Sequence, residues 1–198
     1  MTRTKPLTAP DGSPASPFAF GCMQFGGRAD AAQSAAMYAA CRAAGINHFD
    51  TAWLYTDGRS EQILGELIRA ERDALLIATK AGYTGGAGAA NIRLQLDDSC
   101  RRLGLEMVDI LYLHRFDPDT DLRDTLACLA TLKDAGRIRY VGLSNFAAWQ
   151  VMKAQLLGLE TGLTVDILQP MYSLVKRQAE GEILPMCADQ GIAVAPYS

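Results

Sequence analysis

Asp50, Tyr55, Lys80 and His114 can each hold or pass a proton, and each stands at or just after the end of a predicted β-strand. Asp50 closes the run INHFD, Tyr55 follows five residues later, Lys80 closes LLIATK, and His114 closes VDILYLH. In a barrel of alternating strands and helices, the C-terminal strand ends meet on one rim, where active sites are built. The sequence therefore predicts one site that could hand a proton to a carbonyl oxygen.

Each of these residue types has its own part in such chemistry. Tyrosine is a weak acid with a reference pKa of about 10, and a nearby ammonium from Lys80 would make the phenol a better donor. Asp50 would orient Lys80 by an ion pair, while His114 would hydrogen-bond the substrate oxygen or relay a proton to Tyr55. Alone, each residue also has an ordinary structural explanation, so the joint placement carries the prediction.

Short apolar runs alternate with helix-length segments along almost the whole chain. The predicted strands are residues 17–23, 46–51, 75–80, 107–114, 138–144, 166–171 and 192–197, and the predicted helices are residues 29–44, 60–70, 91–103, 122–135, 147–158 and 177–190. Several helices are followed by a glycine, as expected of C-caps, at positions 45, 104, 136 and 191. Repeated units of this kind imply a parallel sheet with helices outside it.

The pattern favours a (β/α)8 TIM barrel over an open doubly wound sheet. An open dinucleotide-binding sheet should show GxGxxG after its first strand, but here that strand runs into FGCMQFGGRAD. We predict one barrel domain over residues 1–198, with residues 1–16 as an N-terminal cap and Asp11-Gly12 as a hairpin tip. Because such barrels usually need about 250 residues, seven strands and six helices suggest a domain that is incomplete at its C-terminal side.

Composition and charge argue against several other classes of protein. The 198 residues are 49% hydrophobic and 21% charged with a net charge of −3, typical of a soluble globular protein rather than one that binds nucleic acid or an anionic membrane. The five cysteines are dispersed, so we expect free thiols and no metal site, at Cys22, Cys41, Cys100, Cys128 and Cys187. No apolar run could span a membrane and no secretory signal is present, so a cytoplasmic location is expected.

Several ordered motifs resemble those of the aldo-keto reductase family. The stretch FDTAWLY at 49–55, followed by Ser60-Glu61 and Leu64-Gly65, is similar to the family's FDTAxxY…SExxLG signature. The same holds for IATK at 77–80, for RLG at 102–104 with VDILYLH at 108–114, and for GRIRYVGLSN at 136–145. The resemblance runs from about residue 17 to the end of the sequence.

This resemblance implies a (β/α)8 barrel that uses NADPH, without a Rossmann fingerprint, to reduce an aldehyde or ketone reversibly to an alcohol. Tyr55 would be the general acid within the catalytic set Asp50, Tyr55, Lys80 and His114, with Trp53 and His114 lining the substrate pocket. Ser144, Asn145 and Gln169 would bind the nicotinamide carboxamide, Tyr172 would stack on the ring, and Ser198 would begin the pyrophosphate loop. The remaining implied cofactor contacts are Gly21, Cys22, Met23 and Asp50.

Some features depart from the family pattern, and other functions stay open. Residues 56–59 read TDGR, where many members have glycine directly after the tyrosine. In the family, the residues that bind the 2′-phosphate of NADPH follow strand seven, where this sequence ends. The preference for NADPH therefore rests on the resemblance alone, and NADH stays open.

A cofactor-binding regulatory or redox-sensing subunit is the main alternative function. A Schiff-base lyase using Lys80 is another, disfavoured because Asp50 would keep the amine protonated. His48 is predicted to be structural and to face away from the neighbours of Asp50.

Overall fold

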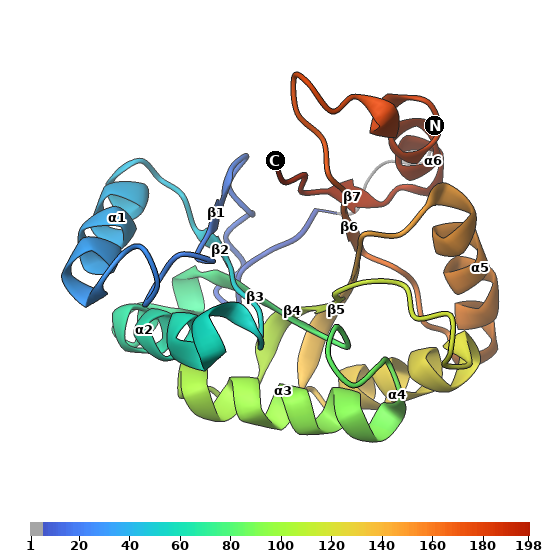
Figure 1. Cartoon of the computed structure of the whole chain (residues 1–198), viewed down its shortest axis with the longest axis horizontal. Coiled ribbons are helices and arrows are strands. Elements are labelled where there is room, and N and C mark those ends of the chain that lie inside the picture. The colour runs from blue at the N-terminus through green and yellow to red at the C-terminus, as the bar shows by residue number, and fades with distance from the viewer. Residues whose placement is uncertain (1–5) are drawn as a thin grey trace.

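The computed structural model describes residues 6–198 as a curled sheet of parallel strands with helices around its outside (Figure 1). Each strand pairs in parallel with the next in chain order, which confirms the predicted barrel-type fold. The strands are β1 (Ala19–Gly21), β2 (His48–Asp50), β3 (Leu76–Ala81), β4 (Val108–Leu113), β5 (Ile138–Ser144), β6 (Ile167–Gln169) and β7 (Ala193–Val194). The α-helices are α1 (Ala31–Ala43), α2 (Arg59–Ile68), α3 (Ala89–Leu103), α4 (Leu122–Asp134), α5 (Ala148–Gly158) and α6 (Ile183–Gln190).

Short 3₁₀ turns fill several connections, and one of them changes a predicted helix. These turns are η1 (Tyr55–Gly58), η2 (Arg72–Ala74), η3 (Leu159–Thr161) and η4 (Gln178–Glu180). The helix expected over 177–190 is split into η4 and α6, with Gly181 and Glu182 between them. The four glycines expected after helices all adopt left-handed backbone angles, with φ of 77° at Gly45, 67° at Gly104, 69° at Gly136 and 68° at Gly191, as C-capping requires.

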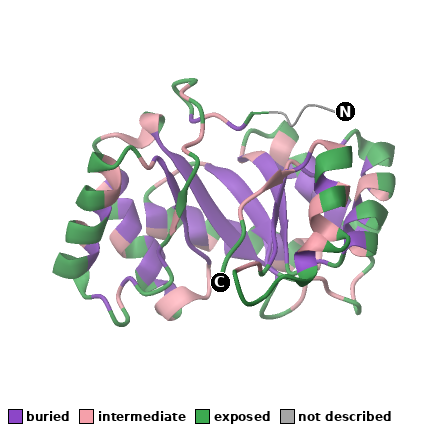
Figure 2. Ribbon diagram, turned by 90° about the horizontal axis from the view of Figure 1, so that it is seen from above, coloured by how far each residue is buried: buried purple, intermediate pink, exposed green. Residues whose placement is uncertain are grey.

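Two apolar layers follow from the alternation of side chains along the strands. One set packs against the helices and includes Phe49, Ile77, Leu111, Val141 and Leu168. The other set fills the inside of the curled sheet and includes Leu76, Ala78, Ile110, Tyr112, Tyr140 and Ile167. Figure 2 shows the central strands buried, whereas the edge strands β1 and β7 are exposed or half-buried and most other exposed residues lie on the outer helix faces and loops. Burial on both faces explains why most strands are nearly continuous apolar runs.

An N-terminal hairpin covers the end of the sheet opposite the predicted site. Thr8 and Pro14 form an antiparallel bridge, Gly12 has a φ of 88°, and Leu7 joins the inner apolar layer. The structure thus confirms the turn at Asp11-Gly12, while residues 1–5 of the expected cap lie outside the described residues. The extent of the domain over the whole chain stays a prediction.

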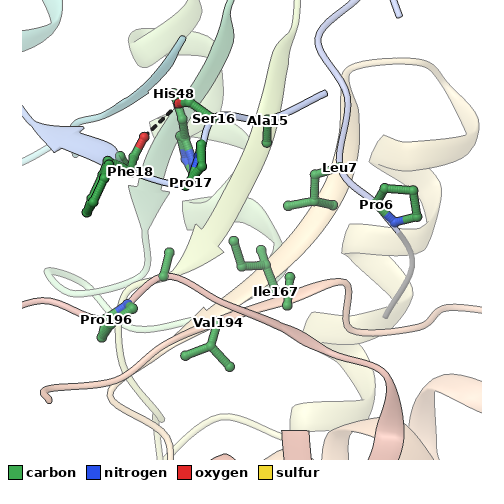
Figure 3. A pocket seen from close by; sticks show the side chains of 13 residues that line it. Pro6, Leu7, Ala15, Ser16, Pro17, Phe18, His48, Ile167, Val194 and Pro196 are labelled. Carbon is green, nitrogen blue, oxygen red and sulfur yellow. Dashed lines mark hydrogen bonds between the residues drawn. The ribbon is translucent and has the colours of Figure 1, made fainter. Parts of the chain in front are cut away.

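The curl leaves a seam between the two edge strands, which are not paired with each other within residues 6–198. A cavity of about 440 Å³ lies in this seam (Figure 3), and its lining includes Leu7, Phe18, His48, Ile167 and Val194. His48 lines this cavity and faces away from Phe49, a neighbour of Asp50 in the outer apolar layer, as the alternation of side chains predicts. His48 therefore lies on the same inner side as Asp50.

No helix within the described range is long and apolar enough to cross a membrane.

Candidate active site

Asp50 and Lys80 form a buried ion pair at the C-terminal rim of the sheet. Lys80 Nζ contacts Asp50 Oδ1 and donates a second hydrogen bond of 2.7 Å to the carbonyl oxygen of Thr51. The other carboxylate oxygen of Asp50 accepts a hydrogen bond of 3.0 Å from Gln169 Nε2. A buried charge needs such partners, and here they tie β2, β3 and β6 together across the inside of the sheet.

Tyr55 lies beside this pair in the turn η1. Lys80 Nζ is 5.0 Å from the centroid of the Tyr55 ring, and the rings of Tyr55 and His114 meet edge-on with centroids 5.8 Å apart. The pKa of Tyr55 is raised, mainly by burial and then by the negative charge of Asp50. This direction is opposite to the one expected from Lys80 alone, because burial disfavours the phenolate. Tyr55 therefore carries its proton at neutral pH.

His114 is buried and uncharged at the same place. Burial, followed by the positive charge of Lys80, lowers the pKa of His114 to about 4. Its Nδ1 atom is buried and has no hydrogen-bond partner among residues 6–198. A neutral imidazole has one ring N–H to donate and one nitrogen to accept, so His114 can hydrogen-bond a ligand oxygen.

Ser144, Asn145 and Gln169 join this cluster from the ends of β5 and β6. The Ser144 hydroxyl donates to the carbonyl oxygen of Gln169 at 3.0 Å. Asn145 has a φ of 59°, and its Nδ2 donates to the carbonyl oxygen of His114 at 2.9 Å. Its Oδ1 accepts a hydrogen bond of 2.5 Å from the Tyr197 hydroxyl. Three of the predicted cofactor residues thus lie in one network with the four catalytic candidates.

The end of β1, which carries the predicted cofactor contacts Gly21 to Met23, lies beside Asp50. Gly21 is opposite Asp50 in the strand register, and the backbone N–H of Cys22 donates to the carbonyl oxygen of Asp50 at 2.7 Å. A Cβ atom on Gly21 would meet no other atom within 4 Å, so there is open space next to this backbone. Met23 follows with half of its surface exposed.

Three predicted site residues make no side-chain hydrogen bond to this network within residues 6–198, although the backbone N–H of Trp53 donates to the carbonyl oxygen of Lys80 at 3.2 Å. The Tyr172 hydroxyl donates to Glu180 at 2.7 Å, and Ser198 is exposed. The indole N–H of Trp53 donates to Asp98 Oδ2 at 3.3 Å, which directs this side chain onto α3. Within the described chain, none of the three makes a side-chain hydrogen bond to a catalytic candidate.

Tyr112 is a site neighbour that was missed at the level of the sequence. Its ring is fully buried on the inner face of β4, with Lys80 Nζ 5.7 Å from the ring centroid. The absence of a side chain at Gly142 makes room for it, because a Cβ there would lie 2.3 Å from a ring carbon of Tyr112. Its position two residues before His114 was the available signal, since alternation places both on one face.

Tyr83 was also left unassigned, although it stands at the mouth of the site. Its ring lies 5.2 Å from that of His114, 46% of its surface is exposed, and the Arg115 guanidinium lies 4.5 Å from its centroid. Tyr83 comes from the glycine-rich loop 82–88, whose sequence carries no local signal for a contact with His114.

No group of three or more His, Cys, Asp or Glu side chains that could hold a metal ion occurs within residues 6–198.

A buried ammonium, a protonated phenol and a neutral imidazole therefore meet at the rim of a curled parallel sheet. This arrangement can donate a proton and stabilise negative charge on an oxygen. Fold and site together define a protein of the β/α-barrel class with proton-donating groups where barrel active sites lie.

Comparison with known proteins gives the family. Residues 17–198 match the model of the Aldo/keto reductase family, and the chain belongs to this family. It is 36% identical over 205 residues to aflatoxin B1 aldehyde reductase member 2 of Rattus norvegicus, covering 100% of this chain and 56% of that protein. It is 36% identical over 204 residues to aflatoxin B1 aldehyde reductase member 4 of Homo sapiens, covering 100% and 59%. With norsolorinic acid reductase B of Aspergillus parasiticus, it shares 36% identity over 169 residues, covering 77% and 44%. The chain thus spans about half the length of these curated relatives.

Proposed function

We propose that this chain carries the catalytic site of an NAD(P)H-dependent reductase that converts an aldehyde or ketone reversibly to an alcohol. The observation that supports this most directly is the Asp50–Lys80 ion pair with the rings of Tyr55 and His114 beside it. Family membership and the reductase names of the relatives support the same reaction class.

The four residues would divide the proton chemistry between them. Tyr55 holds the phenolic proton and gives it to the carbonyl oxygen. Lys80 then stabilises the phenolate that remains, while Asp50 keeps the ammonium in place. His114, neutral at pH 7, donates a hydrogen bond to the same oxygen as negative charge develops on it.

A nicotinamide cofactor would supply the hydride. Hydroxyl and amide groups at the rim suit the carboxamide of such a cofactor, and they come from Ser144, Asn145 and Gln169. The open space next to Gly21 suits a ligand passing close to that backbone. We propose NADPH as the preferred form of the cofactor, with NADH still open. We also propose that Tyr172 stacks on the nicotinamide ring and that Ser198 begins the pyrophosphate loop.

The alternatives have less support. A regulatory or redox-sensing subunit with little turnover does not need the complete set of four proton-handling residues that meets here. A Schiff-base lyase would need a neutral amine at Lys80, but this ammonium is engaged by Asp50 and by the carbonyl oxygen of Thr51. Free thiols at all five cysteines are compatible with the cytoplasmic location that we propose.

Turnover by the full-length protein tests this function. NADPH oxidation would be followed with a panel of aldehydes and ketones, and Tyr55→Phe should lower kcat by about 100-fold or more while NADPH affinity, measured by fluorescence titration, stays within about twofold. Tyr83→Phe is the matched control, because it removes a hydroxyl from a neighbouring ring and should leave turnover close to that of the wild type. Full activity of Tyr55→Phe would rule out its role as the acid.

A further inference from the structure

The most deeply buried charge near the site belongs to a residue with no part in the chemistry above. Glu61 in α2 is fully buried, and its Oε2 lies 3.1 Å from Nη1 of Arg102 in α3. Its Oε1 accepts a hydrogen bond of 2.6 Å from Thr79, the residue before Lys80 on β3. Since a buried carboxylate must be paired and hydrogen-bonded, this pair fixes α2, α3 and β3 relative to one another.

Arg102 also reaches the segment that carries Tyr55, which we call the Tyr55 loop (residues 53–58). Its Nη1 donates a hydrogen bond of 2.7 Å to the carbonyl oxygen of Trp53, and its guanidinium carbon lies 5.4 Å from the Trp53 ring centroid. A Cβ on Gly58 would be 2.5 Å from the same guanidinium carbon. Arg102 therefore contacts the loop both before and after Tyr55.

The backbone of the Tyr55 loop needs such support. Three consecutive residues adopt left-handed angles, with φ of 49° at Thr56, 56° at Asp57 and 86° at Gly58. This region is unfavourable for residues other than glycine, most of all for a β-branched one. Strained backbone persists where surrounding contacts hold it. Beside this loop, the half-buried Arg102 guanidinium, paired with the buried Glu61 carboxylate, supplies such contacts.

We propose that Glu61 and Arg102 are positioning residues that hold the Tyr55 loop so that the phenol faces Lys80 and His114. The effect on turnover rests on the proposed function, but the position of the loop can be measured without turnover. Arg102 suits this role because its planar guanidinium can pair with Glu61, donate to a carbonyl and stack on an indole at once.

Tryptophan fluorescence provides a direct readout of the loop. These 198 residues contain two tryptophans, so Trp149→Phe, together with Phe at any tryptophan outside them in the full-length protein, leaves Trp53 as the only reporter. In this background, Arg102→Gln should shift the Trp53 emission to longer wavelength and at least double its quenching by acrylamide. It should also lower kcat by about 10- to 100-fold, with a smaller change in KM. Glu61→Gln should change the same quantities in the same direction.

Two further variants separate positioning from general stability. Arg69→Gln removes the exposed pair of Arg69 with Glu66 on α2 and should change neither Trp53 quenching nor kcat. Arg102→Lys keeps the charge but loses the planar fork, so its values should lie between those of the wild type and Arg102→Gln. Added guanidinium should restore part of the kcat of Arg102→Ala.

The outcomes distinguish this inference from the proposed function. Unchanged Trp53 quenching and kcat in a folded Arg102→Gln protein would overturn the positioning role. If Arg102→Gln does not fold, unchanged Trp53 quenching and kcat in both single variants, Arg102→Lys and Glu61→Gln, would overturn the positioning role. A wild-type protein without carbonyl-dependent NADPH oxidation would instead refute the reductase, and the Trp53 measurements would still decide whether the pair holds the loop.

Discussion

Burial sets the protonation state of both side chains that we propose to handle the proton. The phenol of Tyr55 and the imidazole of His114 lie close to the charges of Lys80 and Asp50, yet desolvation is the largest influence on each pKa. Both groups are kept in their neutral forms, which suits the proposed parts of Tyr55 as a proton donor and of His114 as a hydrogen-bond donor to an oxygen.

The pKa of His114 leads to a prediction about stability and pH. Its folded-state value of about 4 is below the unfolded value of about 6.5, so the unfolded chain binds more protons between these values. The stability contributed by neutral His114 is therefore complete above about pH 6.5 and falls as the pH drops towards 4. Between pH 7 and 5 the loss should be about 2 kcal/mol.

Urea unfolding from pH 5 to 8 would check this dependence. His114→Gln cannot titrate, so its stability should fall less with decreasing pH than that of the wild type, and the carboxylates common to both cancel in the comparison. Parallel curves for the two proteins would contradict the assigned pKa.

The buried ion pair should respond strongly to the loss of one partner. Lys80→Met leaves the Asp50 carboxylate buried without its cation, which should cost about 3–5 kcal/mol in the free energy of unfolding. Adding Asp50→Asn should recover part of this loss, because no uncompensated charge remains. The exposed pair of Arg123 and Glu160 is the control, and Arg123→Gln should cost no more than about 1 kcal/mol. If the losses of unfolding free energy in Lys80→Met and Asp50→Asn simply add in the double variant, the two side chains are not energetically coupled.

At the scale of elements, residues of the family motifs divide between the rim and the opposite end of the sheet. Asp109 of the VD motif is fully buried near the start of β4, where it pairs with Arg72 at 2.7 Å and Arg139 at 2.9 Å. It also accepts a hydrogen bond of 2.8 Å from the backbone N–H of Ile77. The Asp109 carboxylate therefore links neighbouring strands at the end of the sheet away from the rim. Membership of a family motif does not by itself indicate a catalytic role.

Packing between adjacent strands gives a sharper prediction. Because a Cβ on Gly142 of β5 would lie 2.3 Å from the Tyr112 ring, and that ring is fully buried, Gly142→Ala should destabilise the protein by about 1–3 kcal/mol or more. Gly21→Ala in β1 is the matched control, since open space surrounds its Cβ position. Equal midpoints of thermal or urea unfolding for the two variants would contradict this prediction, because they would show that the Tyr112 ring moves to accommodate the methyl group at little cost.

At the scale of the whole molecule, the seam is the main departure from a closed barrel. The free edges of β1 and β7 present backbone groups that a further strand can pair with, and such edges favour association. We therefore predict that the 198-residue chain by itself associates in solution. Sedimentation analysis would check this, and a folded monomer of 21.4 kDa would contradict it.

A pair of exposed apolar residues provides the control for association. Phe18 lines the seam with 72% of its surface exposed, whereas Leu174 is 88% exposed and lies outside the lining. If the seam drives association, Phe18→Lys should weaken it and Leu174→Lys should leave it unchanged. An equal effect of both substitutions would point to general surface hydrophobicity instead.

The sequence by itself determined those features that depend on neighbouring residues. Alternating apolar periods predicted the parallel sheet with its outer helices, and the glycines at 45, 104, 136 and 191 marked helix ends because only a residue without Cβ adopts left-handed angles freely. Parallel strands carry their C-terminal ends to one rim, so Asp50, Lys80 and His114 could be grouped from order alone.

Only the tertiary structure decided the properties that depend on distant segments meeting. The pKa directions of Tyr55 and His114 come from burial by several strands and loops at once, and no local spacing specifies how much water is excluded. The same holds for the direction of Trp53 towards α3 and for the pairing of Glu61 with Arg102, since α2 and α3 pack together only in the folded chain. The order of residues along the chain therefore pointed to the candidate reactive groups, whereas long-range packing set their charge states and orientations.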